Sequence, residues 1–225
     1  MSRHRIPAAS VAILAAALVV ASAAVAGVHW HDAIEGSGDM ETRAYDLKDF
    51  QVIELTGALD IEVVFGDKQS VEVTLDDNLF ENLEIDVKGK TLVIGWAEEC
   101  DPDADSRVAI ALRRLDAVTI KGAGDIEIKG FKGDRFEYDL HGAGDLEIDG
   151  ETGELDITLN GAGGVEAEDL KARHVKVRLN GVGDVEVTAT ESIDAKVSGV
   201  GEIDFWGKPE EEKTRVSGIG DINRR

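Results

Sequence analysis

The sequence predicts an all-β protein whose C-terminal half is a parallel β-helix, a solenoid of coils of about 19 residues. The phrase Gly-x-Gly recurs six times, five copies are followed by Asp or Glu, and the flanking residues alternate between apolar and polar. A regular spacing of this size is typical of stacked supersecondary units, and an alternation with period two is typical of strands. Each copy is therefore predicted to form one coil.

Residues 1–26 are predicted to be a signal peptide. Arg3 and Arg5 precede an uncharged stretch from Ile6 to Val28, and Ala24-Val25-Ala26 has the small-x-small pattern of a cleavage site. The stretch is long enough to span a bilayer, so an uncleaved membrane anchor is the alternative. Its alanine-rich composition is only weakly hydrophobic and favours cleavage. We therefore expect export to the periplasm, the outer envelope or the medium, with no transmembrane domain after cleavage.

Two segments separate this leader from the repeats. Residues 27–44 are predicted to be a tether, and residues 45–118 an N-terminal β part of the same domain in which the period is lost. Within it, Gly57-Ala58-Leu59-Asp60 and the alternating residues after it look like a degenerate coil. Residues 97–107 are expected to be a loop that separates the two halves.

The repeat solenoid spans residues 119–225. The first glycines of successive copies are 20, 19, 20, 18 and 19 residues apart. A tight corner between two strands needs positive φ or close backbone approach, and glycine permits both. These glycines are predicted to be structural turns: Gly122, Gly124, Gly142, Gly144, Gly161, Gly163, Gly181, Gly183, Gly199, Gly201, Gly218 and Gly220.

Stacking the copies predicts two inward columns of aliphatic residues, which would supply the core. At about 3.3 Å per residue a coil has roughly 60 Å of contour, enough for two or three short strands. The column before the glycines is Ile120, Leu140, Leu159, Leu179, Val197 and Val216. The column after them is Ile126, Leu146, Val165, Val185, Ile203 and Ile222.

The charge of the chain restricts its partners. The net charge is −22, so nucleic acid and anionic lipid are not expected partners, because both are bound by clustered Lys and Arg. A cationic partner, a divalent metal ion or a neutral glycan stays open, as does a purely solubilising role.

Two repeat positions carry stacked carboxylates. Adjacent coils lie about 4.8 Å apart, where two like charges in water repel by roughly 0.9 kcal/mol per pair. Either Ca²⁺ or a basic partner bridges the first column, or its side chains accept backbone N–H bonds at the corner while the second column is a solvated face. We favour the second interpretation, and no other cofactor is expected. The candidate metal column is Asp125, Asp145, Asp184, Glu202 and Asp221, and the second column is Glu127, Glu147, Glu166, Glu186 and Asp204.

A polar column precedes the glycines and consists of Lys121, His141, Asn160, Asn180, Ser198 and Ser217. Stacked asparagines such as Asn160 and Asn180 are expected to pass amide hydrogen bonds from coil to coil. A glycan groove along this column is the alternative. Carbohydrate-binding sites usually contain exposed aromatic residues, and Phe205-Trp206 is the pair in the repeats best placed to serve in this way.

No catalytic constellation is evident, and we predict that the chain is not an enzyme. Residues that recur in every coil are explained by the coil, while the non-recurring His174, Cys100 and Trp96 have no evident partner in the sequence. A carbohydrate-active enzyme of β-helix type is the alternative. A purely structural, oligomerising envelope protein is a third, because the last coil has no obvious polar cap and leaves an edge that another copy could cover.

The order of these motifs resembles the head GIN domain family of auto-transporter adhesins. The residues that carry the resemblance are Phe50-x-x-Ile53-x-Leu55-x-Gly57, Asp60-Ile61-x-Val63, Gly66-Asp67, Leu92-x-Ile94 and Leu115-x-x-Val118-x-Ile120-x-Gly122-x-Gly124-Asp125. The resemblance spans roughly residues 47–223, with Gly164 replacing the acidic residue in the third repeat. It implies a right-handed β-helix, trimeric assembly and an adhesive role.

Together these observations predict a non-catalytic exported β-helix protein that serves as an adhesion-like or envelope-binding module. A glycan or an envelope protein is the expected kind of partner.

Overall fold

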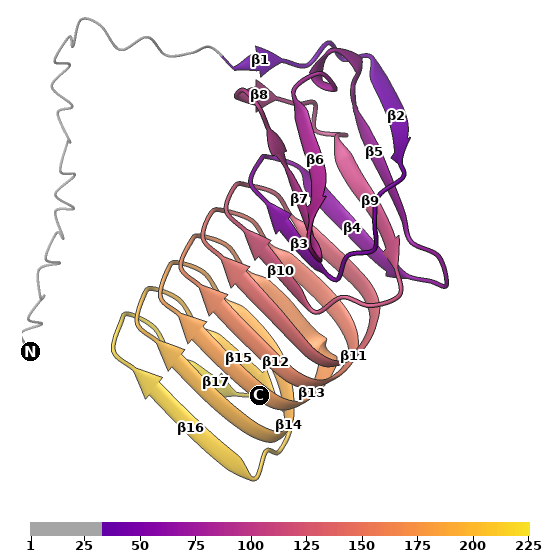
Figure 1. The fold of residues 1–225 in the computed structure, drawn as a ribbon. Coiled ribbons are helices and arrows are strands. Elements are labelled where there is room, and N and C mark those ends of the chain that lie inside the picture. Colours follow the sequence, from indigo (N-terminus) through magenta and orange to yellow (C-terminus); the bar gives the residue numbers. More distant parts are fainter. Residues whose placement is uncertain (1–32) are drawn as a thin grey trace, which may run out of the picture. The chain divides into compact units, whose positions relative to one another are not determined.

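The computed structural model describes residues 33–225 and shows the predicted all-β solenoid (Figure 1). Its only helical element is a single 3-10 turn, Asp77–Leu79, among these residues. The strands before the repeats are β1 Ile34–Glu35, β2 Met40–Tyr45, β3 Val52–Leu55, β4 Asp60–Phe65, β5 Ser70–Asp76, β6 Leu83–Lys88, β7 Thr91–Trp96, β8 Cys100–Asp101, β9 Arg107–Leu112 and β10 Ala117–Ile120. The repeats contain β11 Ile126–Leu140, β12 Leu146–Leu159, β13 Val165–Leu179, β14 Val185–Val197, β15 Ile203–Trp206, β16 Glu211–Val216 and β17 Ile222–Arg224.

Each coil contributes one strand segment to each of two sheets. The long strands β11 to β14 bend midway, so their first part lies in one sheet and their second part in the other (Figure 1). We call the sheet that precedes the Gly-x-Gly turns the pre-turn sheet; it contains β7, β3, β10, the second parts of β11 to β14, and β16. The post-turn sheet contains β9, β4, the first parts of β11 to β14, β15 and β17.

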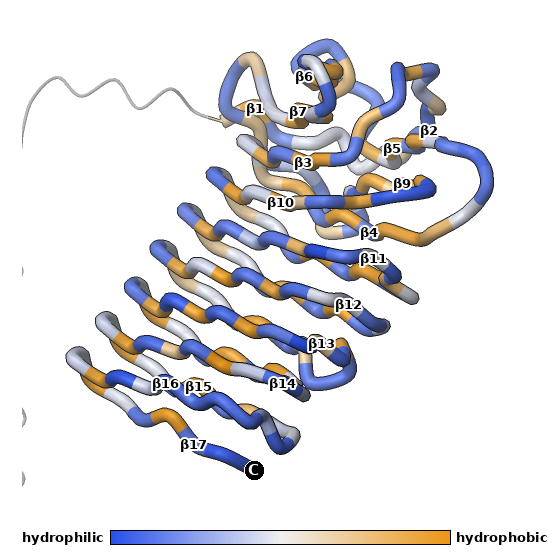
Figure 2. The backbone as a smooth tube through the Cα atoms, turned by 60° about the horizontal axis from the view of Figure 1, so that its bottom comes forward, coloured by the Kyte–Doolittle hydropathy of each residue, from blue (hydrophilic) through white to orange (hydrophobic). Residues whose placement is uncertain are grey.

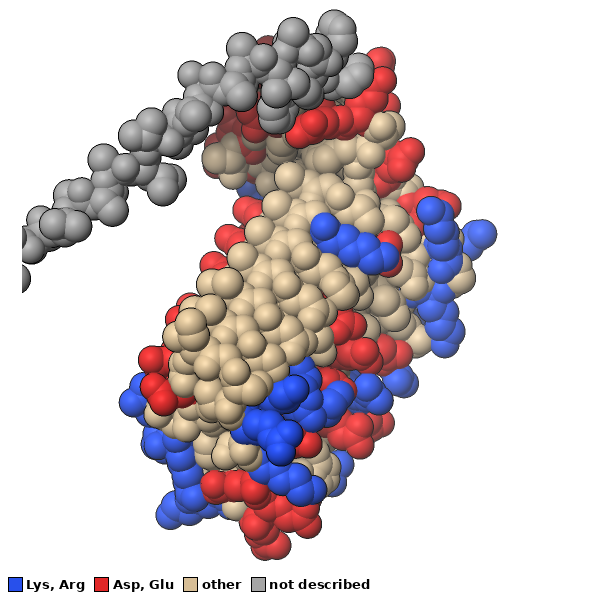
Figure 3. Space-filling view, turned by 90° about the vertical axis from the view of Figure 1, so that its left-hand side faces the viewer, with Lys and Arg blue, Asp and Glu red and all other residues tan. Residues whose placement is uncertain are grey.

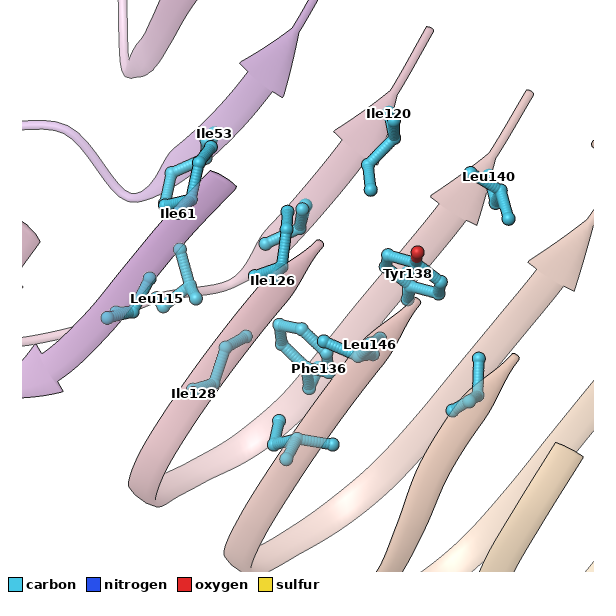
Figure 4. Close-up of a cluster of buried hydrophobic side chains, with 14 of the residues drawn as sticks. Ile53, Ile61, Leu115, Ile120, Ile126, Ile128, Phe136, Tyr138, Leu140 and Leu146 are labelled. Atoms are coloured by element: carbon cyan, nitrogen blue, oxygen red, sulfur yellow. The ribbon is translucent and has the colours of Figure 1, made fainter. Parts of the chain in front are cut away.

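Parallel, in-register pairing aligns the two predicted aliphatic columns. Leu140 pairs with Leu159 in the pre-turn sheet, and Ile126 pairs with Leu146 in the post-turn sheet. Along β11 to β14 hydrophobic and hydrophilic residues alternate (Figure 2), and the inward side chains of the two sheets point toward one another (Figure 4). The columns are buried in every coil except the last, where Val216 is 45% exposed. The predicted core is thus confirmed, and about 25 cal/mol is gained per Å² of apolar surface that it removes from water.

The Gly-x-Gly turns stack directly upon one another. The middle residues form a continuous row of bridges from Ala58 through Ala123 to Ile219. A Cβ on Gly142 would lie 1.8 Å from the carbonyl oxygen of Gly122, far inside van der Waals contact. At Gly183 a Cβ would lie equally close to the carbonyl oxygen of Gly163, and the residue also has a φ of +150°. This turn therefore requires both the backbone conformation and the close approach that glycine allows.

The N-terminal part contains two further coils whose order in space differs from their order in the chain. The degenerate coil is confirmed: β3 and β4 flank a turn in which Ala58 pairs with Ala123. Strands β7 and β9 occur later in the chain but pair with the far edges of β3 and β4, and β10 then returns to the near edge of β3. Strands β2, β5 and β6 add to this end as antiparallel neighbours.

Residues 97–106 connect β7 and β9 within one coil, so the expectation that a loop at 97–107 separates the two halves is wrong. They occupy the place that a Gly-x-Gly turn has in other coils, and we call them the enlarged turn. The enlarged turn contains β8, which pairs with β1. Strands β1 and β2 fall in the stretch predicted to be a tether, while the predicted signal peptide lies outside the described residues. The part of the chain that the structure describes has no helix long and apolar enough to cross a membrane.

The last coil carries charged residues at core positions. Glu212 occupies the register position of Ile193, and Arg224 that of Phe205. The guanidinium of Arg224 donates to Glu212, with 2.7 Å between Nη1 and Oε1. The expectation that this coil has no polar cap is therefore wrong, because an ion pair links the two sheets there.

Candidate binding surface

The predicted metal column forms hydrogen bonds with the backbone of neighbouring coils. Asp125 Oδ1 accepts a 2.9 Å bond from the backbone N–H of Asp145, and Asp184 Oδ1 accepts one of 2.8 Å from Glu202. Asp60 binds the N–H of Asp125 in the same way. The short side chain of aspartate suits this geometry, because it reaches the next coil without leaving the turn.

The same kind of hydrogen bond reaches the third copy of the repeat, where the backbone N–H of Gly164 donates to Asp145 Oδ1. Gly164 has no side chain with which to continue the series toward Asp184. No three His, Cys, Asp or Glu side chains within residues 33–225 converge as a metal site. These bonds are the arrangement that we favour from the sequence, and calcium binding by this column stays the untested alternative.

The second carboxylate column faces outward from the post-turn sheet, and its residues pair in register from coil to coil. We call it the acidic ladder: Glu62, Glu127, Glu147, Glu166, Glu186 and Asp204. Ala109 precedes Glu62 in the sheet and Asn223 follows Asp204, so the ladder has neutral residues at both ends. A shallow depression of about 290 Å³ runs between it and the aspartate column over the first coils.

Two residues of the acidic ladder, Glu127 and Asp204, form ion pairs, and the ladder residues between them form none with the described residues. Lys129 pairs with Glu127 at 2.6 Å, and Arg225 pairs with Asp204 at 2.6 Å. Glu147, Glu166 and Glu186 form no ion pair within the described part of the chain.

The pKa values follow this distribution. Burial raises the pKa of Glu186, and the neighbouring carboxylates of Glu168, Asp204 and Glu166 raise it further, while the Arg225 guanidinium lowers it by a smaller amount. Burial also acts to raise the pKa of Asp204, but hydrogen bonds from Arg225 and Asn223 outweigh it and lower the pKa. The middle of the ladder thus holds like charges at strand spacing with no ion pair of its own among the described residues, and Arg225 and Lys129 act on Glu186 and Glu147 only from the neighbouring ion pairs.

The outer face of the pre-turn sheet has mixed charge. Lys176 pairs with Asp156 at 2.7 Å, and Arg178 with Asp194 at 2.9 Å. The outward column that ends in Arg178, Lys196 and Arg215 is basic in these last three positions, and the neutral Asn180, Ser198 and Ser217 lie between it and the turns. The two outer faces of the later coils therefore differ in sign beyond this polar column.

An uncharged stripe lies between these two faces, along the stacked turns (Figure 3). We call it the Gly-x-Gly stripe: residues 122–124, 142–144, 161–163, 181–183, 199–201 and 218–220. Its backbone groups bond from coil to coil, as when the N–H of Val182 donates to the carbonyl of Gly161. The middle side chains are its exposed groups, and Val182, Val200 and Ile219 are 56%, 43% and 73% exposed.

The polar column beside the stripe contains the predicted asparagine pair. Asn180 Nδ2 donates to Asn160 Oδ1 at 3.0 Å, so the amides do link neighbouring coils. Of the aromatic pair, Phe205 is buried at 2% exposure and only Trp206 is partly accessible. The glycan groove stays the untested alternative.

The enlarged turn brings together two residues that the sequence left without partners. Trp96 and Cys100 line a shallow depression of about 450 Å³ with Gly57 and Ala58, at the N-terminal end of the stripe. Cys100 is buried, and burial raises the pKa of its thiol. Sequence spacing could not show this juxtaposition, because it depends on β7 pairing with β3.

His174 lies on the surface with two polar neighbours. Its Nδ1 is 2.9 Å from Ser192 Oγ, and its Nε2 is 3.5 Å from Glu191 Oε2. The side chains of His174 and Glu191 are 46% and 53% exposed, so water has free access to the cluster. A catalytic site relies on exclusion of water and on fixed donors, and this arrangement supplies neither feature.

Comparison with solved structures finds proteins that are similar to this chain, and the first of them shares its fold. The crystal structure of a "putative adhesin" from Bacteroides fragilis is similar to this chain with 24% identity and a TM-score of 0.70, covering 85% of this chain and 100% of that one. A "putative adhesin" from Parabacteroides merdae has 18% identity and a TM-score of 0.48, covering 85% and 99%. A "putative lipid binding protein" from Parabacteroides distasonis has 24% identity and a TM-score of 0.44, covering 85% and 100%.

Among curated proteins, none is similar in sequence. Residues 49–209 match the family described as "Putative auto-transporter adhesin, head GIN domain", which is most of the described domain. The chain belongs to the head GIN domain family.

Proposed function

We propose that this protein is a non-catalytic, adhesion-like binding module of the cell envelope that binds a cationic partner along the acidic ladder. The observation that carries the proposal is the unpaired middle of that ladder, where Glu147, Glu166 and Glu186 stack without an ion pair among the described residues. Membership of a family described as adhesin heads supports the adhesive part.

The ladder has a physical reason to accept a cation. In-register carboxylates about 4.8 Å apart repel one another, and the repulsion persists as long as only water and salt surround them. A partner with cationic groups at a similar spacing would relieve several such repulsions at once. The net charge of −22 would also accelerate the encounter with that partner.

The test uses oligolysine peptides as the cationic probe and measures binding by fluorescence anisotropy at several salt concentrations. The Glu147→Gln/Glu166→Gln/Glu186→Gln variant should bind at least about tenfold more weakly, because it removes three charges that face the probe. The matched control is Glu84→Gln/Glu98→Gln/Glu99→Gln, which removes three exposed carboxylates outside the ladder. Equal weakening by both triple variants would show that only net charge matters and would overturn the proposal.

The cellular part of the proposal is tested separately. A tagged copy should be cleaved when intact cells are treated with an external protease, because an adhesive module has to face outward. Cleavage only after the envelope is permeabilised would contradict adhesion and leave a periplasmic structural role.

A further inference from the structure

The last three coils differ from the earlier coils in the side chains that they place on the Gly-x-Gly stripe. The middle residue is alanine in the first three copies, whereas Val182, Val200 and Ile219 occupy it in the last three. All three are exposed, and they form a continuous row because each bridges to the next. Adjacent exposed apolar side chains on a flat surface are typical of an interaction site.

The two flanks of this row carry opposite charges. On the pre-turn side lie Arg178, Lys196 and Arg215, and Lys196 and Arg215 form no ion pair within the described residues. On the post-turn side lie the carboxylates Asp184, Glu186, Glu202, Asp204 and Asp221, of which Asp204 is paired with Arg225, so this flank stays acidic overall. Figure 3 shows the uncharged stripe with acidic residues along one side, and at its lower end basic residues along the other side as well as beside the acidic ones.

We propose that this row is the contact surface between two copies of the chain, related by a two-fold axis parallel to the solenoid axis. Such an axis places each apolar residue opposite its own counterpart and exchanges the two flanks. The basic flank of each copy then faces the acidic flank of the other, at the same coil. An interface of this kind is isologous and closes as a dimer, in place of the trimer that the family resemblance implies.

The charges also exclude the alternative two-fold axis. An axis across the stripe would reverse the direction of the second copy and bring acidic flank against acidic flank. Like charges juxtaposed in an interface cost several kcal/mol. Charge complementarity therefore selects the parallel arrangement.

The size of the contact predicts a weak dimer. The enlarged turns of both copies come to the same end, over Ala58 and Ala123, so the contact is centred on the last three coils. Two steps of about 4.8 Å give a short apolar row, and the interface falls at the low end of specific interfaces. We expect the dimer to be populated at about 0.1 mM protein and above.

The first test is sedimentation equilibrium of the full chain, measured over a series of protein concentrations. The Val200→Asp/Ile219→Asp variant should raise the dissociation constant more than tenfold, because it places four carboxylates in one contact. Val64→Asp is the matched control, since Val64 is 47% exposed but lies on β4 away from the row. Thermal melts show whether the variants fold. A monomeric wild-type protein at 0.5 mM, or equal weakening by the control, overturns the proposal.

Cysteine cross-linking tests the axis. In a Cys100→Ser background, the Val200→Cys variant should form a disulfide-linked dimer with itself. The Ser198→Cys and Glu202→Cys variants should cross-link with each other faster than either does with itself, because these residues lie on opposite flanks. Faster self-linking of the Glu202→Cys variant would indicate the reversed arrangement and contradict the proposal. The outcome does not depend on the cationic partner proposed above.

Discussion

Gly183 shows at the scale of one residue why the repeat keeps its glycines. Its φ is +150°, and a Cβ there would lie 1.8 Å from the carbonyl oxygen of Gly163. We expect Gly183→Ala to lower the free energy of unfolding by more than about 2 kcal/mol, because strain and a backbone clash add together. Urea unfolding measures the change. Val182→Ala, in the same turn but exposed, should change it by less than about 0.5 kcal/mol.

Asp76 is a buried carboxylate that joins three segments. It accepts hydrogen bonds from the backbone N–H groups of Asp103 (2.9 Å) and Gly38 (2.8 Å), and the bond from Asp103 is the main reason why its pKa is lowered. Asp76→Asn should lower the free energy of unfolding by about 1–3 kcal/mol at pH 7, because one backbone donor loses a charged partner.

The pH dependence of that effect has a defined sign. A lowered folded-state pKa means that Asp76 stabilises the fold fully above its unfolded pKa of about 3.9 and ceases to do so as the pH falls through the lower folded value. The difference between wild type and Asp76→Asn in urea unfolding should therefore shrink below about pH 4. The exposed Asp49→Asn serves as control, and a difference independent of pH would contradict this role.

Tyr138 buries a hydroxyl that has no hydrogen-bond partner within the described residues. Burial raises its pKa strongly, and the carboxylates of Asp145 and Asp125 raise it further, so the hydroxyl stays protonated. Tyr138→Phe removes an unsatisfied polar group. It should leave the free energy of unfolding unchanged or raise it by up to about 1 kcal/mol. A loss of more than 1 kcal/mol would show that a bound water satisfies the hydroxyl.

The acidic ladder gives the prediction for a single element. Glu166 stacks between Glu147 and Glu186 at strand spacing. Glu166→Gln should raise the free energy of unfolding by a few tenths to about 1 kcal/mol at low salt, because two like-charge repulsions are removed. The gain should fall in 1 M NaCl, where charges are screened within about 3 Å. The exposed Glu84→Gln should show little effect at either salt concentration.

The elements that the sequence predicts well are those built from local, repeated information. Ile120 and Leu140 are recognisable as core residues because the period and the alternation place them in equivalent positions of successive coils. The aspartate column was also interpretable, because a short acidic side chain beside a glycine turn is a known backbone acceptor.

Other features depend on pairing between distant segments and could not be predicted. The sequence around Trp96 does not indicate that β7 joins the far edge of β3. The sequence does not predict the ion pair of Glu212 and Arg224. The inward positions of β16 hold polar residues, so its sequence shows no alternation of apolar and polar residues. The basic flank opposite the acidic one emerges only when Arg178, Lys196 and Arg215 are aligned by the strand register.

The whole molecule provides the test for calcium. Because Asp125 and Asp145 already bind the backbone of the next coil, we expect the melting temperature of the chain to shift by less than about 1 °C between chelator and millimolar Ca²⁺. Differential scanning calorimetry makes the measurement, with Mg²⁺ as the ionic-strength control. A rise of several degrees specific to Ca²⁺ would establish that the predicted column Asp125, Asp145, Asp184, Glu202 and Asp221 binds the ion.

The spatial order of the N-terminal coils has a consequence for how the chain acquires its structure. The coil of β3 and β4 lies between one neighbour formed by β7 and β9 and another formed by β10 and β11. Its two neighbours are complete only when residues 52–129 are all present, so we expect this region to form as one cooperative nucleus with slow, long-range contacts. Each later coil contacts only the coil before it. We therefore expect the remaining coils to form one after another from this nucleus toward the C-terminus.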